Sequence, residues 1–294
     1  MSKKFRGNLL LLLTAVIWGS AFVAQKQGMD FVEPFTFNAV RNFIATLVLM
    51  AVIPFFSSPK TEQFKEDKKT LVIGGIWCGI VLFIAGALQQ IGVQYTTSGK
   101  AGFITTLYIV IVPILALFLG KKVDKKIWFC ILVAGVGFYL LSIKDDFSIG
   151  KGDFLVFLCA IFFSVHILVI DYFSPRVDGV KMSCIQFFVC GLISMVAMFV
   201  FESPNIDGIL QAIVPILYTA VLSSGVGYTL QIVAQKDTDP TIASLILSLE
   251  SVFSVLAGAI LLNEMLTVKE AIGCVFIFFA IIFAQLPKRN RANT

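Results

Sequence analysis

The 294-residue sequence predicts an all-α, polytopic membrane protein in which ten transmembrane helices form a 5+5 repeat of inverted topology. Three observations predict this fold. Hydrophobic residues make up 58% of the chain and charged residues only 14%, and the mean hydropathy is +0.92, far above that of a soluble domain. Long apolar runs follow one another with short polar interruptions. Short motifs of the first half recur in the second.

The apolar runs are long enough to cross a bilayer. A hydrocarbon core of about 30 Å needs about 20 apolar residues per helix, so the chain has room for about ten spans. Because hydrocarbon offers no hydrogen-bond partners and the runs do not alternate like barrel strands, each span is expected to be a helix. The first span is expected to be retained, not cleaved as a signal peptide, because it has a counterpart later in the chain. The expected spans are 8–25, 34–55, 71–93, 101–120, 127–143, 153–172, 182–201, 210–231, 241–262 and 268–286.

The basic residues predict the orientation. If the N-terminus is cytoplasmic, 17 of the 23 lysines and arginines lie on the cytoplasmic side, five lie outside and Arg41 lies within a span. This bias predicts that both termini are cytoplasmic. The same lysines account for the net charge of +5 and imply no nucleic-acid partner.

The two halves resemble each other. Gln90-Ile91-x-x-Gln94-x-x-Thr97 recurs as Gln231-Ile232-x-x-Gln235-x-x-Thr238, and Gly7-Asn8-Leu9-Leu10 recurs as Gly152-Asp153-Phe154-Leu155. We therefore expect one repeat over residues 1–146 and a second over 147–294. An odd number of spans per repeat threads the second half through the membrane in the opposite sense, and inverted repeats build binding sites near the bilayer midplane.

Polar side chains within the spans are the candidate binding residues. Amides and hydroxyls can simply join helices, at about 0.6 kcal/mol each, but as a set these stripes favour a lined cavity. The candidates besides the charged residues are Trp18, Asn38, Gln90, Tyr108, Gln186, Tyr228 and Gln231.

Glu250 is the only charged residue in the run from Thr241 to Leu262. Intramembrane acids are costly and usually face a cavity and a partner, and Arg41 is the only opposite charge within a span. Two interpretations stay open. Glu250 is a proton or cation site, or it is a structural group bonded to Ser254 or to a neighbouring helix.

Other candidates favour structural roles. The single histidine, His166, is expected near the cytoplasmic side as a packed or interfacial residue, with a proton relay as the alternative. The six cysteines all fall within spans and read as buried hydrophobes, so we expect no metal site and no cofactor. Pro113 is expected to kink the fourth span.

The chain resembles a known family at two places. Trp18-Gly19-Ser20-Ala21-Phe22-Val23, followed by Lys26, Pro34 and Arg41, is similar to the opening of the EamA-type proteins of the drug/metabolite transporter superfamily. Ser248-Leu249-Glu250-Ser251-Val252-Phe253, followed by Leu261-Leu262-Asn263-Glu264, resembles that family's LEPVF…LLGE segment. Ser251 replaces the usual proline, which predicts a straighter ninth helix. Lys121 stands where the family often has glutamate, so Glu264 has no acidic twin and is expected to be structural.

The resemblance implies a secondary transporter of the inner (cytoplasmic) membrane of the cell. Such a transporter moves a small metabolite, such as an amino acid, commonly outward, by alternating access and with proton coupling in some members. The expected partners are the small-molecule substrate, the lipid bilayer and, in the coupled case, protons; monomer and homodimer both stay open. The chain has no Gly-x-x-x-x-Gly-Lys-[ST] motif for ATP. A flippase for a lipid-linked or amphipathic substrate is the first alternative. A membrane-embedded enzyme is the second, but a single histidine and no Gly-x-Ser-x-Gly elbow speak against catalysis.

Overall fold

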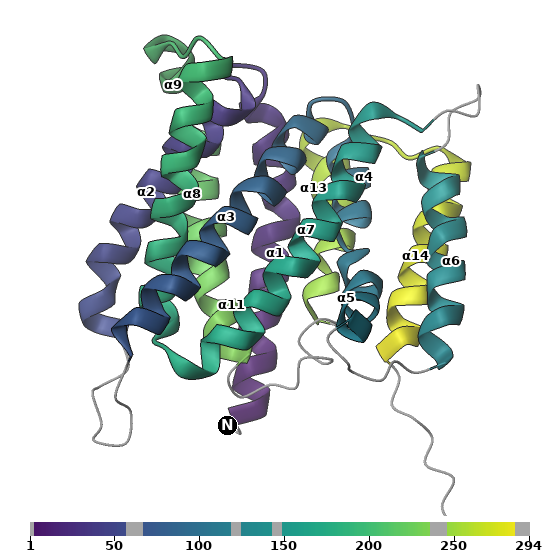
Figure 1. The fold of residues 1–294 in the computed structure, drawn as a ribbon. Coiled ribbons are helices and arrows are strands. Elements are labelled where there is room, and N and C mark those ends of the chain that lie inside the picture. The colour runs from purple at the N-terminus through teal and green to yellow at the C-terminus, as the bar shows by residue number, and fades with distance from the viewer. Residues whose placement is uncertain (1–2, 57–66, 119–124, 143–148, 236–245, 286–294) are drawn as a thin grey trace, which may run out of the picture.

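The computed structural model describes residues 3–56, 67–118, 125–142, 149–235 and 246–285, and these residues are overwhelmingly helical (Figure 1). Seven helices are long and apolar enough to cross a membrane, and Trp128–Leu141 and Ile246–Leu262 are shorter apolar helices. The expected all-α, polytopic membrane fold is confirmed. Residues 241–245 of the expected ninth span lie outside the described residues.

The first half contains five crossings of the bundle. Its helices are α1 (Lys3–Gly28), α2 (Pro34–Phe56), α3 (Lys68–Val93), α4 (Ser98–Thr105) with α5 (Tyr108–Phe118), and α6 (Lys125–Ser142). The fourth crossing is thus made of two shorter helices.

The second half repeats this order in the opposite direction. Its elements are α7 (Lys151–Phe173), the short turn η1 (Ser174–Arg176), α8 (Gly179–Phe201), α9 (Ile206–Gln211), α10 (Ile213–Leu217), η2 (Tyr218–Gly227), α11 (Tyr228–Gln235), α13 (Glu250–Leu262) and α14 (Val268–Gln285). Here α10, η2 and α11 together make the eighth crossing. In Figure 1, α1 begins at the lower end of the bundle and α7 begins at the upper end.

Helix starts follow the local sequence. Asp67, Thr97 and Asp178 each accept backbone N–H groups as N-caps of α3, α4 and α8. Pro34 is the first residue of α2, where a missing N–H costs nothing. Asn263 ends α13 in the left-handed conformation with φ 54°.

Three pairs of equivalent spans from the two halves pack against each other: α2 with α8, α4 with α13 and α6 with α14. Helix α3 packs instead against α7 and α8, which are not its counterpart. Figure 1 shows α6 and α14 as a pair at one edge of the bundle and α1 near its centre, where α1 contacts both α13 and η2. Helix α1 therefore lies between the eighth and ninth crossings.

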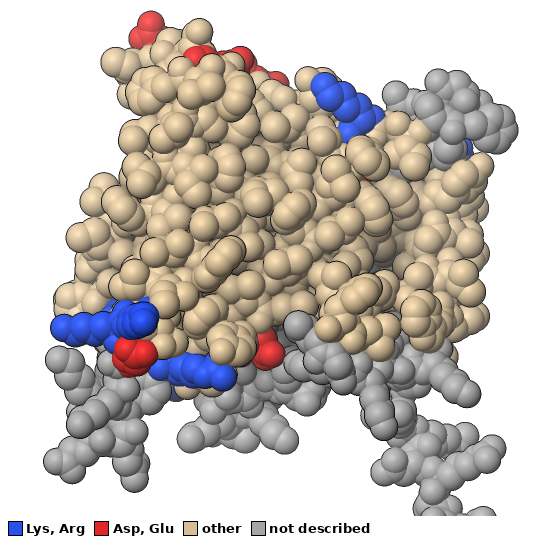
Figure 2. All heavy atoms as spheres, in the orientation of Figure 1, with Lys and Arg blue, Asp and Glu red and all other residues tan. Residues whose placement is uncertain are grey.

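The outside of the bundle is apolar between its two ends. On the face drawn in Figure 2, the charged side chains lie at the upper and lower ends, and a band without charge separates them. Large apolar side chains of the described helices, such as Leu132, Phe199 and Ile260, are exposed. This distribution matches a hydrocarbon belt between two polar interfaces.

Two crossings are interrupted, and a third has an unusual helix. The fourth crossing breaks at Thr106 and Leu107, about two turns before Pro113, so the discontinuity expected from the proline is present but lies upstream of it. In the ninth crossing the regular helix is interrupted at Leu249, whose backbone stays in the right-handed helical region, with φ −61° and ψ −14°. The straighter helix expected from Ser251 stays a prediction. In the eighth, η2 is a ten-residue π-helix, a rare geometry that is found most often at functional sites.

Glycines bring some helices into close backbone contact. A Cβ at Gly137 of α6 would lie 2.8 Å from the carbonyl oxygen of Gly273 on α14, and a Cβ at Gly273 would lie 2.7 Å from the carbonyl oxygen of Gly137. Small residues allow this approach, and dispersion contacts then hold membrane helices together.

We expect Gly137→Leu to separate α6 from α14 and to destabilise the protein by about 1–3 kcal/mol, because the new side chain meets backbone atoms that cannot move away. Thermal unfolding in detergent, followed by tryptophan fluorescence, measures the effect. Gly135→Leu is the matched control, since a Cβ there has no atom within 4 Å. Equal midpoints for the two variants would contradict this packing.

Candidate functional site

The two interrupted crossings meet at one hydrogen bond. Tyr108 is the first residue of α5, immediately after the break in the fourth crossing, and its hydroxyl donates to Oε1 of Glu250 at 3.1 Å. Glu250 is the first residue of α13, directly after the turn at Leu249. Interruptions in corresponding spans of the two halves thus place a phenol and a carboxylate together in the interior.

Glu250 is buried, with 3% of its surface exposed. Its carboxylate lies in the first turn of α13, where the helix dipole favours a negative charge. The expected bond to Ser254 is wrong, because the Ser254 hydroxyl donates to the carbonyl oxygen of Ser251 at 2.8 Å. The sequence could not select Tyr108 as the partner, because the contact joins different helices.

Arg41 belongs to a second polar group nearer the upper end. Its Nη1 donates to Oε1 of Gln25 at a long 3.4 Å, and its guanidinium carbon lies 5.9 Å from the ring centre of Phe37. Asn38 donates to the carbonyl oxygen of Gly86, and Gln90 donates to that of Gln25. One polar group therefore joins α1, α2 and α3.

The expected pairing of Arg41 with Glu250 is not found. The guanidinium contacts Gln25, whereas the carboxylate accepts from Tyr108. At about 1.5 Å per residue, Arg41 lies about 10 Å below Pro34, the upper end of α2, and Glu250 lies about 18 Å below Leu262, the upper end of α13. Because the two side chains differ in depth and in partners, they belong to two separate polar layers, one around Arg41 and one around Glu250.

Aromatic rings from four helices meet around Tyr228. The ring centres of Trp18 and Tyr228 are 4.8 Å apart, and Tyr228 also meets His166 at 6.1 Å and Phe187 at 5.3 Å. His166 Nε2 is 3.1 Å from Oε1 of Gln186. Of the two positions expected for His166, packed or interfacial, the packed one agrees with the structure, because this side chain is only 2% exposed.

Several of these buried side chains have polar atoms without a hydrogen-bond partner. They share burial within the bundle and membership of the two polar layers, and they include both donors and acceptors. Six of the nine such atoms in the described residues belong to these side chains and are Asn38 Oδ1, Arg41 Nε, Asn42 Oδ1, Gln90 Oε1, Gln186 Nε2 and Gln231 Oε1, and the other three are Asn8 Oδ1, Ser183 Oγ and Ser194 Oγ. Because unpaired polar groups in a low-dielectric interior are costly, their concentration here is typical of a site that binds a polar ligand.

Sequence reasoning missed Gln25 as a member of these layers. Gln25 lies seven residues after Trp18, on the same face of α1, and this spacing was a usable signal. For His166 the sequence did not indicate the partner, because Gln186 comes from a different helix.

Other acidic residues hold the upper end of the bundle together. The Glu264 carboxylate accepts from the backbone N of Ser98 at 2.9 Å and from the Ser98 hydroxyl, and these bonds cap the start of α4. The structural role expected for Glu264 agrees with these contacts. Lys100 forms ion pairs with Asp153 at 3.1 Å and with Glu270 at 3.2 Å. These contacts join α4, α7, α13 and α14.

Lys26 makes a further connection at the upper end. Its ammonium donates to the backbone carbonyls of Val93, Gln94 and Thr96. Three carbonyls that α3 and the following turn leave unpaired are thus satisfied by α1.

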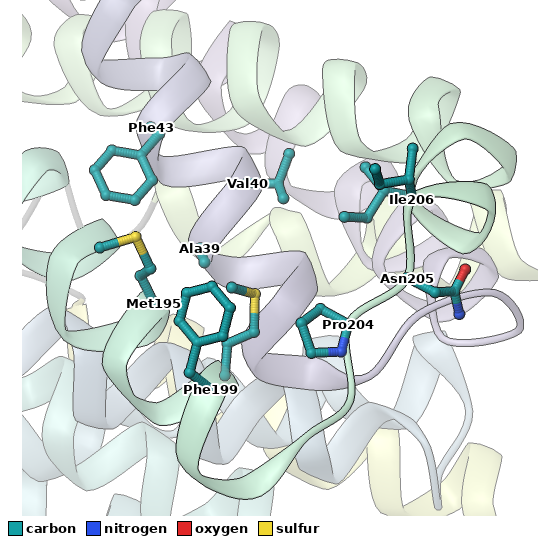
Figure 3. A pocket seen from close by; sticks show the side chains of 10 residues that line it. Ala39, Val40, Phe43, Met195, Phe199, Pro204, Asn205 and Ile206 are labelled. Carbon is teal, nitrogen blue, oxygen red and sulfur yellow. The ribbon is translucent and has the colours of Figure 1, made fainter.

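An apolar pocket lies away from both polar layers. It has a volume of about 330 Å³ between α2, α8 and the start of α9. Figure 3 shows side chains such as Phe43, Met195 and Phe199 around it. Asn205, its one amide, already accepts from the backbone N of Gly208. The pocket therefore offers apolar surface and none of the unpaired polar groups.

Comparisons with known proteins identify the family to which the chain belongs. The model of the EamA-like transporter family matches residues 5–143 and 150–285. An uncharacterized transporter of Archaeoglobus fulgidus is 35% identical over 285 residues, which is 97% of this chain and 87% of that protein. The WAT1-related protein At3g02690, chloroplastic, of Arabidopsis thaliana is 24% identical and covers 96% of this chain and 70% of its own length. A crystal structure aligns with a TM-score of 0.67 at 17% identity, over 94% of this chain and 96% of that one, which shows the fold alone.

These findings define a multi-pass membrane transporter. The chain belongs to the EamA-like transporter family, part of the drug/metabolite transporter superfamily.

We expect the thermal effects of Arg41→Gln and Glu250→Gln to add within about 0.3–0.5 kcal/mol, because the two groups share no contact. Thermal midpoints of the two single variants and the double variant give this cycle. The matched control is the cycle of Tyr108→Phe with Glu250→Gln, where the direct hydrogen bond predicts non-additivity of about 0.5–3 kcal/mol. The two-layer arrangement is wrong if the Arg41 cycle is as strongly coupled as the control.

Proposed function

We propose that the protein is a secondary transporter that moves an amino acid or a closely related zwitterionic metabolite out of the cell by alternating access, with Glu250 as a proton site. The observation that carries the proposal is the meeting of the two interrupted crossings at Tyr108 and Glu250. Discontinuous helices in corresponding spans of inverted repeats are where carriers of this architecture bind substrate and ions. The repeats proposed are residues 1–146 and 147–294.

The unpaired groups around Arg41 support the zwitterionic substrate. A buried guanidinium with one long hydrogen bond is costly, and a substrate carboxylate would supply the missing anion through Nε. Two unpaired acceptors lie near it: Asn38 Oδ1 on the same helix, α2, and Gln90 Oε1 on α3. An ammonium group donates to such acceptors and has no acceptor of its own. The guanidinium would bind a carboxylate, and the two acceptors would bind an ammonium group. The site therefore suits a small molecule that carries both groups.

The remaining candidates have distinct parts in this proposal. Trp18, Arg41 and Tyr228 are the partly exposed members of the cluster, whereas Gln186 and Gln231 are buried beside them. Tyr108 holds the Glu250 carboxylate, and a carboxylate that gains and loses a proton is the simplest coupling group in a membrane interior.

The orientation proposed puts the lower end of the bundle, with both termini, in the cytoplasm. In this orientation the contacts of Lys26, Lys100, Asp153 and Glu264 close the external end. Alternating access then requires these contacts to part when the site faces outward.

The flippase remains the second candidate, because the apolar pocket lies on the same helix as Asn38 and opens beside exposed Phe199. A lipid-facing groove next to polar residues would suit a substrate with an acyl chain. Transbilayer movement of a fluorescent phospholipid in proteoliposomes distinguishes this function from metabolite transport.

We expect purified protein in proteoliposomes to transport at least one member of a panel of amino acids, and the methyl ester of that amino acid to compete at least about tenfold more weakly. The ester keeps the ammonium but lacks the carboxylate that pairs with Arg41. Counterflow of radiolabelled substrate measures both. Transport at the protein-free rate for the whole panel would refute the amino-acid proposal, and phospholipid movement in the same vesicles would favour the flippase.

We expect Glu250→Gln to reduce transport driven by a pH gradient at least about tenfold and to retain exchange of labelled for unlabelled substrate, because glutamine keeps the acceptor for Tyr108 but cannot release a proton. The measurement compares both modes in the same vesicles. Glu202→Gln is the matched control, since it changes a carboxylate outside the proposed site that accepts from the backbone N–H groups of Phe35 and Thr36 at the start of α2. Undiminished gradient-driven transport by Glu250→Gln would remove the coupling role.

A further inference from the structure

The π-helix η2 is held from one side by α1. The indole Nε1 of Trp18 donates to the carbonyl oxygen of Ser223 at 3.1 Å, and the Thr14 hydroxyl, which bonds within its own helix at 2.9 Å, also approaches the carbonyl oxygen of Gly227 at 3.4 Å. At the start of η2, the hydroxyls of Ser20 and Tyr218 are 2.6 Å apart. These contacts follow the whole length of the π segment.

The fit between Trp18 and η2 is tight. A Cβ at Gly227 would lie 2.5 Å from Nε1 of Trp18 and 3.1 Å from its Cδ1, so the indole occupies the place of a side chain at this position. By contrast, a Cβ at Gly225 in the same segment has no atom nearer than 3.4 Å. The Trp18 ring also packs on Tyr228, the first residue after η2.

The next residue of α1 contacts the helix of Glu250. A Cβ at Gly19 would lie 2.7 Å from the carbonyl oxygen of Glu250 and would overlap Phe253. Trp18 and Gly19 therefore touch η2 and α13 from adjacent positions on one rigid helix.

The register of η2 decides where Tyr228 points. In a π-helix each N–H pairs with the carbonyl five residues back, so a π turn contains one residue more than an α turn. Conversion of one such turn to α geometry rotates everything after it by about 100°, since an α-helix has 3.6 residues per turn. Such a rotation would carry Tyr228 and Gln231 away from the cluster.

We propose that Trp18 is a positioning residue: its indole N–H keeps η2 in the π register, and α1, through Trp18 and Gly19, couples movement of α13 at Glu250 to the orientation of Tyr228. The inference rests on the proposed function in taking Glu250 and Tyr228 as parts of the transport site. It changes the role expected for Trp18. Trp18 was a candidate for contacting the substrate, and here it orients Tyr228, which belongs to the transport site.

Hydrogen exchange of the backbone amides of η2, measured by mass spectrometry in lipid nanodiscs, tests the positioning role without any substrate. Trp18→Phe keeps a ring but loses the N–H donor, so η2 amides should exchange about two- to tenfold faster, the range expected for one net hydrogen bond. Trp77→Phe is the matched control, because Trp77 is 54% exposed on α3. Equal η2 exchange in the two variants overturns the proposal.

A second pair of variants substitutes residues within η2 itself. Gly227→Ala displaces the indole, and Gly225→Ala does not. Only Gly227→Ala should accelerate η2 exchange, and it should add little to Trp18→Phe. Equal effects of the two alanines overturn the proposal even if Trp18→Phe fails to fold.

The coupling is tested by Glu250→Gln. We expect this change to alter η2 exchange by at least about twofold in the wild-type chain and to have no effect in Trp18→Phe. An equal change in both backgrounds, or none in either, overturns coupling through Trp18. Because these experiments use no transport assay, their failure leaves the proposed function to be judged by the transport data alone.

Discussion

The hydrocarbon interior supplies no hydrogen-bond partner, and the architecture of this protein depends on that constraint. An unbroken helix satisfies its own backbone, but the fourth, eighth and ninth crossings are not regular α-helices. Side chains satisfy backbone carbonyls at these places. Within the fourth crossing Thr106 donates to Phe103, and within the ninth Ser251 donates to Ser248. The π-helix η2 instead receives its donor from another crossing, because Trp18 of α1 donates to Ser223, and this contact joins α1 to η2.

Small residues make this possible, because they let backbones approach within reach of short side chains. Gly19 of α1 and Gly102 of α4 both contact α13, the second at the Ser254 hydroxyl. The helix that carries Glu250 is therefore packed between α1 and α4 at backbone contact distance. Since α1 also contacts η2, one helix connects the buried carboxylate with the aromatic cluster around Tyr228.

The charges divide into two kinds by their surroundings. At the upper end, Glu264 caps a helix and Lys100 pairs with two acids, so these groups are satisfied by the protein. In the interior, Glu250 has one phenolic donor and Arg41 one long hydrogen bond. The first kind stabilises the arrangement of helices, whereas the second retains unused capacity for charge-assisted bonds, which is what a transported polar molecule needs.

The sequence by itself determined the membrane class, the ten crossings and the family, because these follow from apolar run lengths and from local motifs such as Trp18-Gly19 and the segment around Glu250. It also selected most residues of the polar layers, since polar groups are rare in hydrocarbon. Only the tertiary structure decided their partners. Glu250 meets Tyr108 and not Ser254 or Arg41, and His166 lies inside the cluster, because such contacts depend on helix rotation and depth, which run lengths do not encode. The π geometry of η2 depends on donors from α1, far away in the chain, and no local signal in residues 218–227 predicts it.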